Sequence, residues 1–98
     1  MNIKIKREDK KVTLSISGSI DTNTAPEFIE CLKEQMPGST ELLLDLKETE
    51  YISSAGLRAI LFAQKTMDSQ GSMTVANVNS DIMDTFELTG FTEILKII

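Results

Sequence analysis

Two adjacent serines, Ser53 and Ser54, hold the position in this chain that most favours chemistry. They follow a strand expected over residues 41–47 and precede a helix expected over residues 55–68. The first turn of a helix offers unpaired backbone N–H groups and the positive end of the helix dipole, so it favours negative charge. A serine at this junction is therefore either a helix cap or an acceptor for a phosphate group, and position alone leaves both interpretations open.

The composition excludes several classes of catalytic site. The 98 residues contain no histidine and a single cysteine, Cys31, which we interpret as structural or incidental. Neither a His-dependent triad nor a Cys/His zinc site can be built from this set, and no phosphate-binding G-x-x-x-x-G-K-S/T loop occurs. We therefore expect no catalytic residues, no metal site and no cofactor, and a protein that is not an enzyme.

Charge and hydropathy limit the partners. The net charge of -5 argues against a nucleic-acid partner, because phosphate backbones require a basic surface. No apolar run approaches the ~20 residues needed to span a bilayer, and early lysines interrupt any signal-like segment, so we expect a cytoplasmic protein with no membrane partner. Half of the ten basic residues lie near the start, at Lys4, Lys6, Arg7, Lys10 and Lys11. They indicate the solvated, protected edge of a strand hairpin, with a basic docking patch as the alternative.

The hydrophobic periodicity of the first half predicts a hairpin followed by a helix and a strand. Apolar residues alternate over 1–7 and 11–17, which is typical of two antiparallel strands, and a loop is expected over 18–23. Thr24 and Glu27 form a potential capping box at the start of the first helix, with Pro26 in its first turn. The largely apolar run over 42–46, Leu-Leu-Leu-Asp-Leu, predicts a central strand covered on both faces.

The second half repeats the strand–helix alternation. Gly71 is expected to close the second helix, and residues 72–78 should form a strand. A third helix should begin at Asn79 or Ser80 and end in a left-handed cap at Gly90. A short strand over 95–98 would complete the order β-β-α-β-α-β-α-β.

This order predicts an α/β fold in one domain, residues 1–98. Strand–helix–strand units give parallel neighbours, whereas the N-terminal hairpin is antiparallel. We therefore expect a small mixed β-sheet, with an antiparallel N-terminal hairpin and then parallel β-α-β units, packed with three or four helices.

The second helix has two apolar faces when its residues are placed at about 100° intervals. The expected core stripe consists of Leu57, Ile60, Leu61, Ala63 and Met67, with Gln64 among them. A nearly opposite cluster consists of Ala55, Ala59, Phe62 and Thr66. Phe62 is either covered by a neighbouring helix, singly exposed, or the aromatic anchor of a partner-binding patch. Ser54 projects toward Arg58 and this cluster, whereas Ser53 leans toward the core or caps the helix, so Ser54 is the better phosphoacceptor candidate.

Several motifs in order resemble those of one known family. The segment 51–58, Tyr-Ile-Ser-Ser-Ala-Gly-Leu-Arg, resembles the phosphorylation site of bacterial anti-sigma factor antagonists, which are single STAS domains. Four other segments are similar to the family's G-x-x-D loop, first-helix start, central strand and closing turn, in that order: Gly18–Asp21, Thr24–Pro26, Leu44–Leu46 and Leu88–Phe91. Ser53 stands where relatives often have Asp. The resemblance covers nearly the whole chain.

The resemblance implies a partner switch. The unphosphorylated antagonist would bind an anti-sigma factor that is a serine kinase and so free the sigma factor. Phosphorylation, carried over to Ser54, would end binding, and a metal-dependent serine phosphatase would restore it. The implied partner-binding residues are Asp21, Thr22, Ser53, Ser54, Ala55, Gly56, Arg58, Ala59 and Phe62. We expect a monomer or weak dimer.

Two alternatives stay open at this stage. A STAS scaffold subunit of a stressosome-like or lipid-transport complex would need no phosphorylation cycle. A small-ligand or nucleotide-binding domain could use Asp21 and the loop of Ser53 and Ser54 to line its pocket.

Overall fold

The computed structural model describes all 98 residues, and it confirms the α/β fold. Its elements are β1 (Asn2–Glu8), β2 (Lys11–Ile20), α1 (Ala25–Gln35), β3 (Glu41–Asp45), β4 (Thr49–Ile52), α2 (Ser54–Asp68), β5 (Ser72–Ala76), α3 (Ser80–Thr89) and a 3-10 turn (Phe91–Glu93). Two expectations were wrong. The sequence pattern missed β4, and the expected final strand amounts to a single parallel bridge between Val75 and Ile97.

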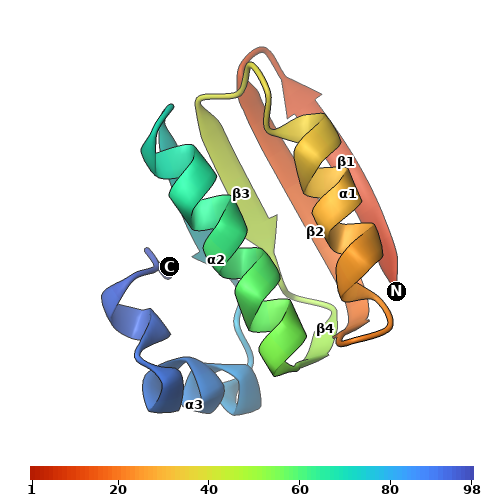
Figure 1. Cartoon of the computed structure of the whole chain (residues 1–98), viewed down its shortest axis with the longest axis vertical. Helices are drawn as coiled ribbons and strands as arrows, with labels where there is room; N and C mark the ends of the chain where they lie inside the picture. The colour runs from red at the N-terminus through yellow and green to blue at the C-terminus, as the bar shows by residue number, and fades with distance from the viewer.

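The five strands form the predicted mixed sheet. The main path runs β1-β2-β3-β5, and β4 pairs with β2 beside this path. The hairpin β1–β2 is antiparallel, and the pairs β2–β3, β3–β5 and β2–β4 are all parallel. Figure 1 shows β1 at one border of the sheet and the two longer helices, α1 and α2, lying in front of the strands and running roughly along them. The parallel pairs bring the carboxyl ends of β2 and β4 to the same edge.

Strand β2 extends into the region expected to be a loop. It pairs with β3 only as far as Ser15, and from Gly18 onwards it pairs with β4, with a register shift between Gly18 and Ser19. Gly18 adopts a φ of +92°, which glycine reaches without strain, and its N–H donates to the Glu48 carbonyl at 3.0 Å. The predicted loop over 18–23 therefore begins only at Asp21, because a bulge redirects the strand instead of ending it.

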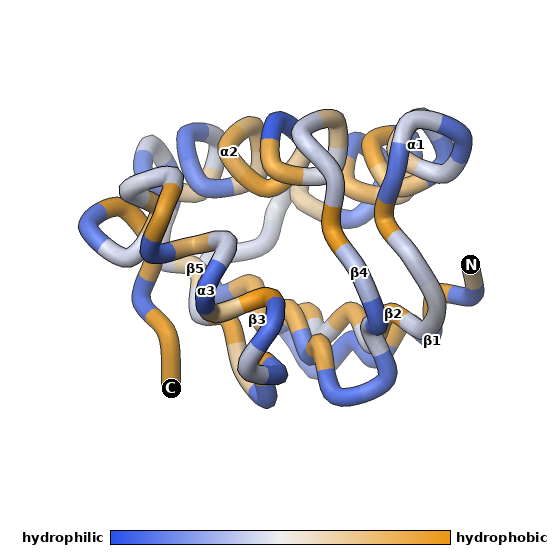
Figure 2. Tube along the Cα trace, turned by 90° about the horizontal axis from the view of Figure 1, so that it is seen from below, coloured by the Kyte–Doolittle hydropathy of each residue, from blue (hydrophilic) through white to orange (hydrophobic).

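The helices α1 and α2 cover one face of the sheet and leave the other open, as Figure 2 shows. In β3, Leu42 and Leu44 are buried, whereas Leu43 and Asp45 are only partly buried. The prediction that β3 is covered on both faces was therefore wrong. The run Leu-Leu-Leu-Asp-Leu over 42–46 also fits a half-covered strand, because a single leucine on a solvated face is ordinary and Asp45 lies on the same face.

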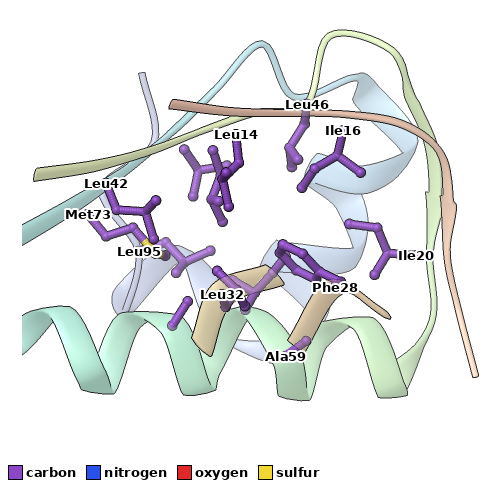
Figure 3. Packing of buried hydrophobic residues seen from close by; sticks show 14 of the residues in the cluster. Leu14, Ile16, Ile20, Phe28, Leu32, Leu42, Leu46, Ala59, Met73 and Leu95 are labelled. Carbon is purple, nitrogen blue, oxygen red and sulfur yellow. The ribbon is translucent and has the colours of Figure 1, made fainter. Parts of the chain in front are cut away.

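The core lies between the sheet and the two helices. It is a cluster of 21 buried residues, and Figure 3 shows the β2 side chains Leu14 and Ile16 above Phe28 and Leu32 of α1. Ala59, on α2, lies below Phe28 in this view. Small residues on this side of α2 allow α1 to pack closely beside it.

The caps at the helix ends agree only in part with those predicted from the sequence. At α3, Asn79 is the cap and Gly90 ends the helix with a φ of +79°, as predicted. At α1, the predicted capping box is absent, because the Thr24 hydroxyl instead accepts from the Asp21 N–H at 2.9 Å and donates to the Ser19 carbonyl at 2.7 Å. After α2, the backbone of Gly71 lies very close to that of Thr40, which precedes β3. A Cβ at position 71 would lie 1.9 Å from the Thr40 carbonyl oxygen.

Candidate functional site

The N-terminus of α2 lies where β2 and β4 end side by side. The Ser53 N–H donates to the Ile20 carbonyl at 2.9 Å, which ties the β4–α2 junction to the last residue of β2. The loop that begins at Asp21 therefore lies beside the two serines. The structure thus brings together two segments of the predicted site that are more than 30 residues apart in the chain.

Ser53 and Ser54 have different roles at this junction. Ser53 has extended backbone angles and its Oγ accepts from the Gly56 N–H at 3.4 Å, so it is the cap of α2. Ser54 is the first residue of the helix and is exposed. Ser53 is therefore the cap of α2, and Ser54 is the serine whose side chain is exposed.

The positive end of the α2 dipole is not neutralised by the chain itself. The first turn of α2 contains no acidic residue, and the Ser53 cap bond is long. Arg58, one turn further along, is exposed and forms no ion pair. Negative charge placed at Ser54 would therefore meet free helix N–H groups and a free guanidinium.

Two residues expected to touch a partner are buried instead. Ala59 is 0% exposed and belongs to the core cluster, because α1 covers this side of α2. Gly56 is also buried, and a Cβ on it would lie 2.5 Å from the Ile20 carbonyl oxygen. Both residues let α2 approach its neighbours closely, so their inclusion in the contact surface was wrong.

Phe62 lies at the boundary between covered and exposed surface. Its side chain is 36% exposed, and with the end of α1 it lines a hollow of about 310 Å³. The neighbouring residues Ala55 and Thr66 are partly buried. The helix α1 therefore covers part of the second apolar cluster of α2, which agrees with the interpretation that a neighbouring helix covers Phe62. The cover is incomplete, because part of the Phe62 side chain remains exposed.

The carboxylate of Asp21 stabilises the loop after β2. One Asp21 oxygen accepts from the N–H groups of Asn23 and Thr24 at 2.9 and 3.1 Å, so this side chain shapes the loop. Thr22 is exposed. Asp21 thus positions its neighbours, and Thr22 is the residue of this loop whose surface is open.

Sequence reasoning missed Tyr51 as a candidate contact residue. Its side chain is 57% exposed, and it lies in β4 three residues before Ser54. The available signal was the strand alternation itself, because Ile52 is buried and its neighbour must face the other way. We name the exposed residues Thr22, Tyr51, Ser54, Arg58 and Phe62 the Ser54 face.

Features elsewhere in the molecule do not compete with this site. A hollow of about 540 Å³ lies at the open face of the sheet and is lined almost entirely by polar residues, without Ser54. No group of three or more His, Cys, Asp or Glu side chains is arranged to hold a metal ion. Burial raises the pKa of the Cys31 thiol, with Glu34 and Glu27 adding to the effect, so this cysteine is a poor nucleophile. No helix has both the length and the apolar character to cross a bilayer.

Comparison with known proteins identifies the family. The STAS domain model matches residues 2–98. The chain is 30% identical over 102 residues to the anti-sigma-B factor antagonist of Listeria monocytogenes and 28% identical over 98 residues to that of Bacillus subtilis. In both cases the match covers 99% of this chain and 90% of the relative.

Solved structures share the fold. A putative anti-sigma factor antagonist from Thermotoga maritima superposes with a TM-score of 0.90 at 23% identity, over 97% of this chain and 84% of that one. The phosphorylated form of the Bacillus cell fate determinant SpoIIAA superposes with a TM-score of 0.77 at 11% identity, over 99% and 91%. With the family model matching nearly every residue, this chain belongs to the STAS-domain family of anti-sigma factor antagonists.

Proposed function

We propose that the unphosphorylated protein binds an anti-sigma factor that is also a serine kinase, and that this binding frees a sigma factor. Phosphorylation of Ser54 by that kinase ends the binding, and a serine phosphatase restores it. One observation carries the proposal: Ser54 presents an exposed hydroxyl at an uncompensated helix N-terminus, while a different residue, Ser53, caps the helix. In this cycle the protein is a regulator and not an enzyme.

The relatives support this role. Two proteins that match along nearly their whole length are anti-sigma-B factor antagonists. A protein of the same fold, SpoIIAA, has a phosphorylated form. A shared fold alone would not assign a modified residue, so the assignment to Ser54 depends on the geometry of the α2 N-terminus.

The physical effect of the phosphate is to block contact. It adds about -1.5 to -2 charges. At the first residue of α2 these charges favour the helix, so they leave the fold intact. On a contact surface, however, they must be desolvated, which is unfavourable unless the partner supplies matching cations. Arg58, one turn away, can bond the phosphate within the protein itself and so keep it on the Ser54 face.

The acceptor assignment is tested with two serine variants. Wild-type protein, Ser54→Ala and Ser53→Ala are each incubated with the cognate kinase and radiolabelled ATP. We expect Ser54→Ala to take up no phosphate while still binding the kinase, and Ser53→Ala to be phosphorylated. Undiminished incorporation in Ser54→Ala would sink the assignment.

The blocking effect is tested with a matched pair of charge variants. Ser80 occupies the first residue of α3 and is exposed, just as Ser54 is in α2. We expect Ser54→Asp to weaken kinase binding at least tenfold by calorimetry and Ser80→Asp to leave it unchanged. Equal weakening by both variants would show a general charge effect instead of a specific contact. Stable co-purification with a transporter ATPase, and with no kinase, would replace the proposal by the scaffold role.

A further inference from the structure

The strand β1 has an open edge. It pairs with β2 alone and forms the border of the main path β1-β2-β3-β5, as Figure 1 also shows. Along its seven residues, the backbone groups that point away from β2 have no strand partner. Such an edge is a template on which another extended chain can add main-chain hydrogen bonds.

The two faces of β1 have different chemistry. Lys4 and Lys6 lie across from Ser15 and Thr13, and therefore on the open face of the sheet. Ile3 and Ile5 lie across from the buried Ile16 and Leu14, on the face that the helices cover. Because β1 is at the border, Ile5 remains 49% exposed although its neighbour Leu14 is 0% exposed. The edge thus offers cations on one face and apolar surface on the other.

The charge of this edge is opposite to that of the whole molecule. Residues 4–11 carry five cations and two carboxylates, a net charge of +3, whereas the whole chain carries -5. Lys6 is paired with Glu8 at 3.0 Å, but Lys4, Lys10 and Lys11 form no ion pair. This concentration of free positive charge favours an acidic partner.

A second copy of the chain is a poor partner for the same reason. Pairing β1 with another β1 would place lysines opposite lysines, and like charges across strands are destabilising. Edge lysines in general protect sheets from such self-pairing. They repel basic strands, however, whereas a strand with carboxylates opposite Lys4 and Lys6 would be attracted.

We propose that β1 is a docking edge for an extended, acidic segment of a partner protein, which adds to the sheet as an outer strand. The segment alternates acidic and apolar residues, so that its carboxylates face Lys4 and Lys6 and its apolar side chains extend the surface of Ile3 and Ile5. This interaction is separate from the Ser54 switch and uses none of the residues of the Ser54 face.

The edge is held in place before binding. The Arg7 guanidinium donates to the Gln35 and Pro37 carbonyls at 3.3 and 3.4 Å, which fastens the end of β1 to the end of α1. A strand that is already ordered loses little conformational entropy when a partner pairs with it. The partner segment alone must then become ordered.

Synthetic octapeptides and NMR test the proposal. Isotope-labelled protein is titrated with a peptide of alternating Glu and Val, the same peptide with Lys in place of Glu, and an alternating Glu-Val peptide whose backbone is N-methylated at every residue, which removes the N–H donors from both of its edges. We expect the acidic peptide to shift β1 resonances and to slow exchange of the outward β1 amides. We expect the N-methylated peptide, which retains the charge but cannot pair as a strand, to bind at least tenfold more weakly, and the lysine peptide not to bind.

Protein variants locate the contact. The double variant Lys4→Glu/Lys6→Glu should weaken binding of the acidic peptide at least tenfold. The milder double variant Lys4→Gln/Lys6→Gln should weaken it less, and it should disturb the hairpin less than the glutamate pair does. Lys96→Glu, an exposed lysine at the C-terminal end of the chain beyond β5, is the matched control and should leave binding unchanged. The proposal is overturned if outward β1 amides gain no protection at millimolar peptide, if the N-methylated peptide binds equally well, or if the free protein dimerises through β1.

Discussion

The helices α2 and α3 begin in the same structural setting, yet their N-termini differ in the strength of the cap and in the charge of the first turn. Each follows a parallel strand, and each has a side-chain cap that accepts from the third N–H group of the helix. At α3 the Asn79 bond to Ile82 is 2.8 Å long, and Asp81 places a carboxylate in the first turn. At α2 the Ser53 bond is 3.4 Å long, and the first turn has no acidic residue.

The difference separates an end that stabilises the fold from an end that is available to a ligand. Asn79 also donates to the Thr49 carbonyl at 3.1 Å, so its amide joins α3 to β4 as well as capping the helix. Nothing comparable satisfies the start of α2. A helix end left without a strong cap or a carboxylate loses some stability but can receive a charged group from outside.

The largest expected effect tests whether the N-terminus of α2 accepts substitutions at its exposed residues but not at its buried ones. Gly56→Ala should lower the free energy of unfolding by about 3 kcal/mol, because its Cβ would lie 2.5 Å from the Ile20 carbonyl oxygen. Ser54→Ala, two residues earlier and exposed, should change it by less than about 0.5 kcal/mol. Urea unfolding of both variants measures the contrast, and similar values for the two would show that the close approach at Gly56 is not needed.

The second effect compares the two caps directly. Asn79→Ala should lower the free energy of unfolding by about 1–2 kcal/mol, because it removes a short cap bond and the bond to Thr49. Ser53→Ala should remove only about 0.5 kcal/mol, at the low end for cap residues. Thermal unfolding of the pair at matched pH provides the test. If Ser53→Ala were the more damaging change, the comparison between the two helix ends would fail.

A smaller effect is expected from completing the cap of α2. Ser53→Asp places a stronger acceptor and a negative charge at the helix start, so it should raise the free energy of unfolding by about 0.5–1 kcal/mol. The same denaturation assay applies, with Ser69→Asp, at the other end of α2, as the control expected to give no gain.

The smallest effect concerns charge in the first turn. Ser54→Asp should stabilise the fold by about 0.3–0.5 kcal/mol, and Asp81→Asn should destabilise it by a similar amount. Both changes should shrink when the salt concentration is raised from low values to about 1 M, because the charges are exposed. A destabilising Ser54→Asp would contradict the view that phosphate blocks a partner without disturbing the helix.

Local features of the fold were predictable from the sequence, and features set by distant neighbours were not. The hairpin, the Asn79 cap and the Gly90 end depend on a few adjacent residues, and all were predicted correctly. The strand β4 was missed because its two central residues, Glu50 and Tyr51, are exposed, and because it forms only where the Gly18 bulge turns β2 aside. That bulge lies about 30 residues earlier in the chain.

The candidate site was predictable to a similar degree. The helical wheel separated Ser53 from Ser54 correctly, since that separation depends only on the position of the helix start. It could not show that α1 lies against α2, so Ala59 was assigned to the contact surface although it is buried. Tyr51 was overlooked because β4, the strand that contains it, was not predicted, so no alternation pattern indicated that its side chain is exposed.

The redirected strand β2 determines the form in which Ser54 is presented to the kinase of the proposed cycle. The first part of β2 pairs with β1 and β3, and its last residue holds Ser53 in place through the Ile20 carbonyl. The junction cannot come away from the sheet without pulling apart a strand at the centre of the core. A kinase that modifies Ser54 therefore meets a folded, three-dimensional epitope and not an extended peptide. We expect a synthetic peptide of residues 48–62 to be a poor substrate, however closely its sequence follows the family motif.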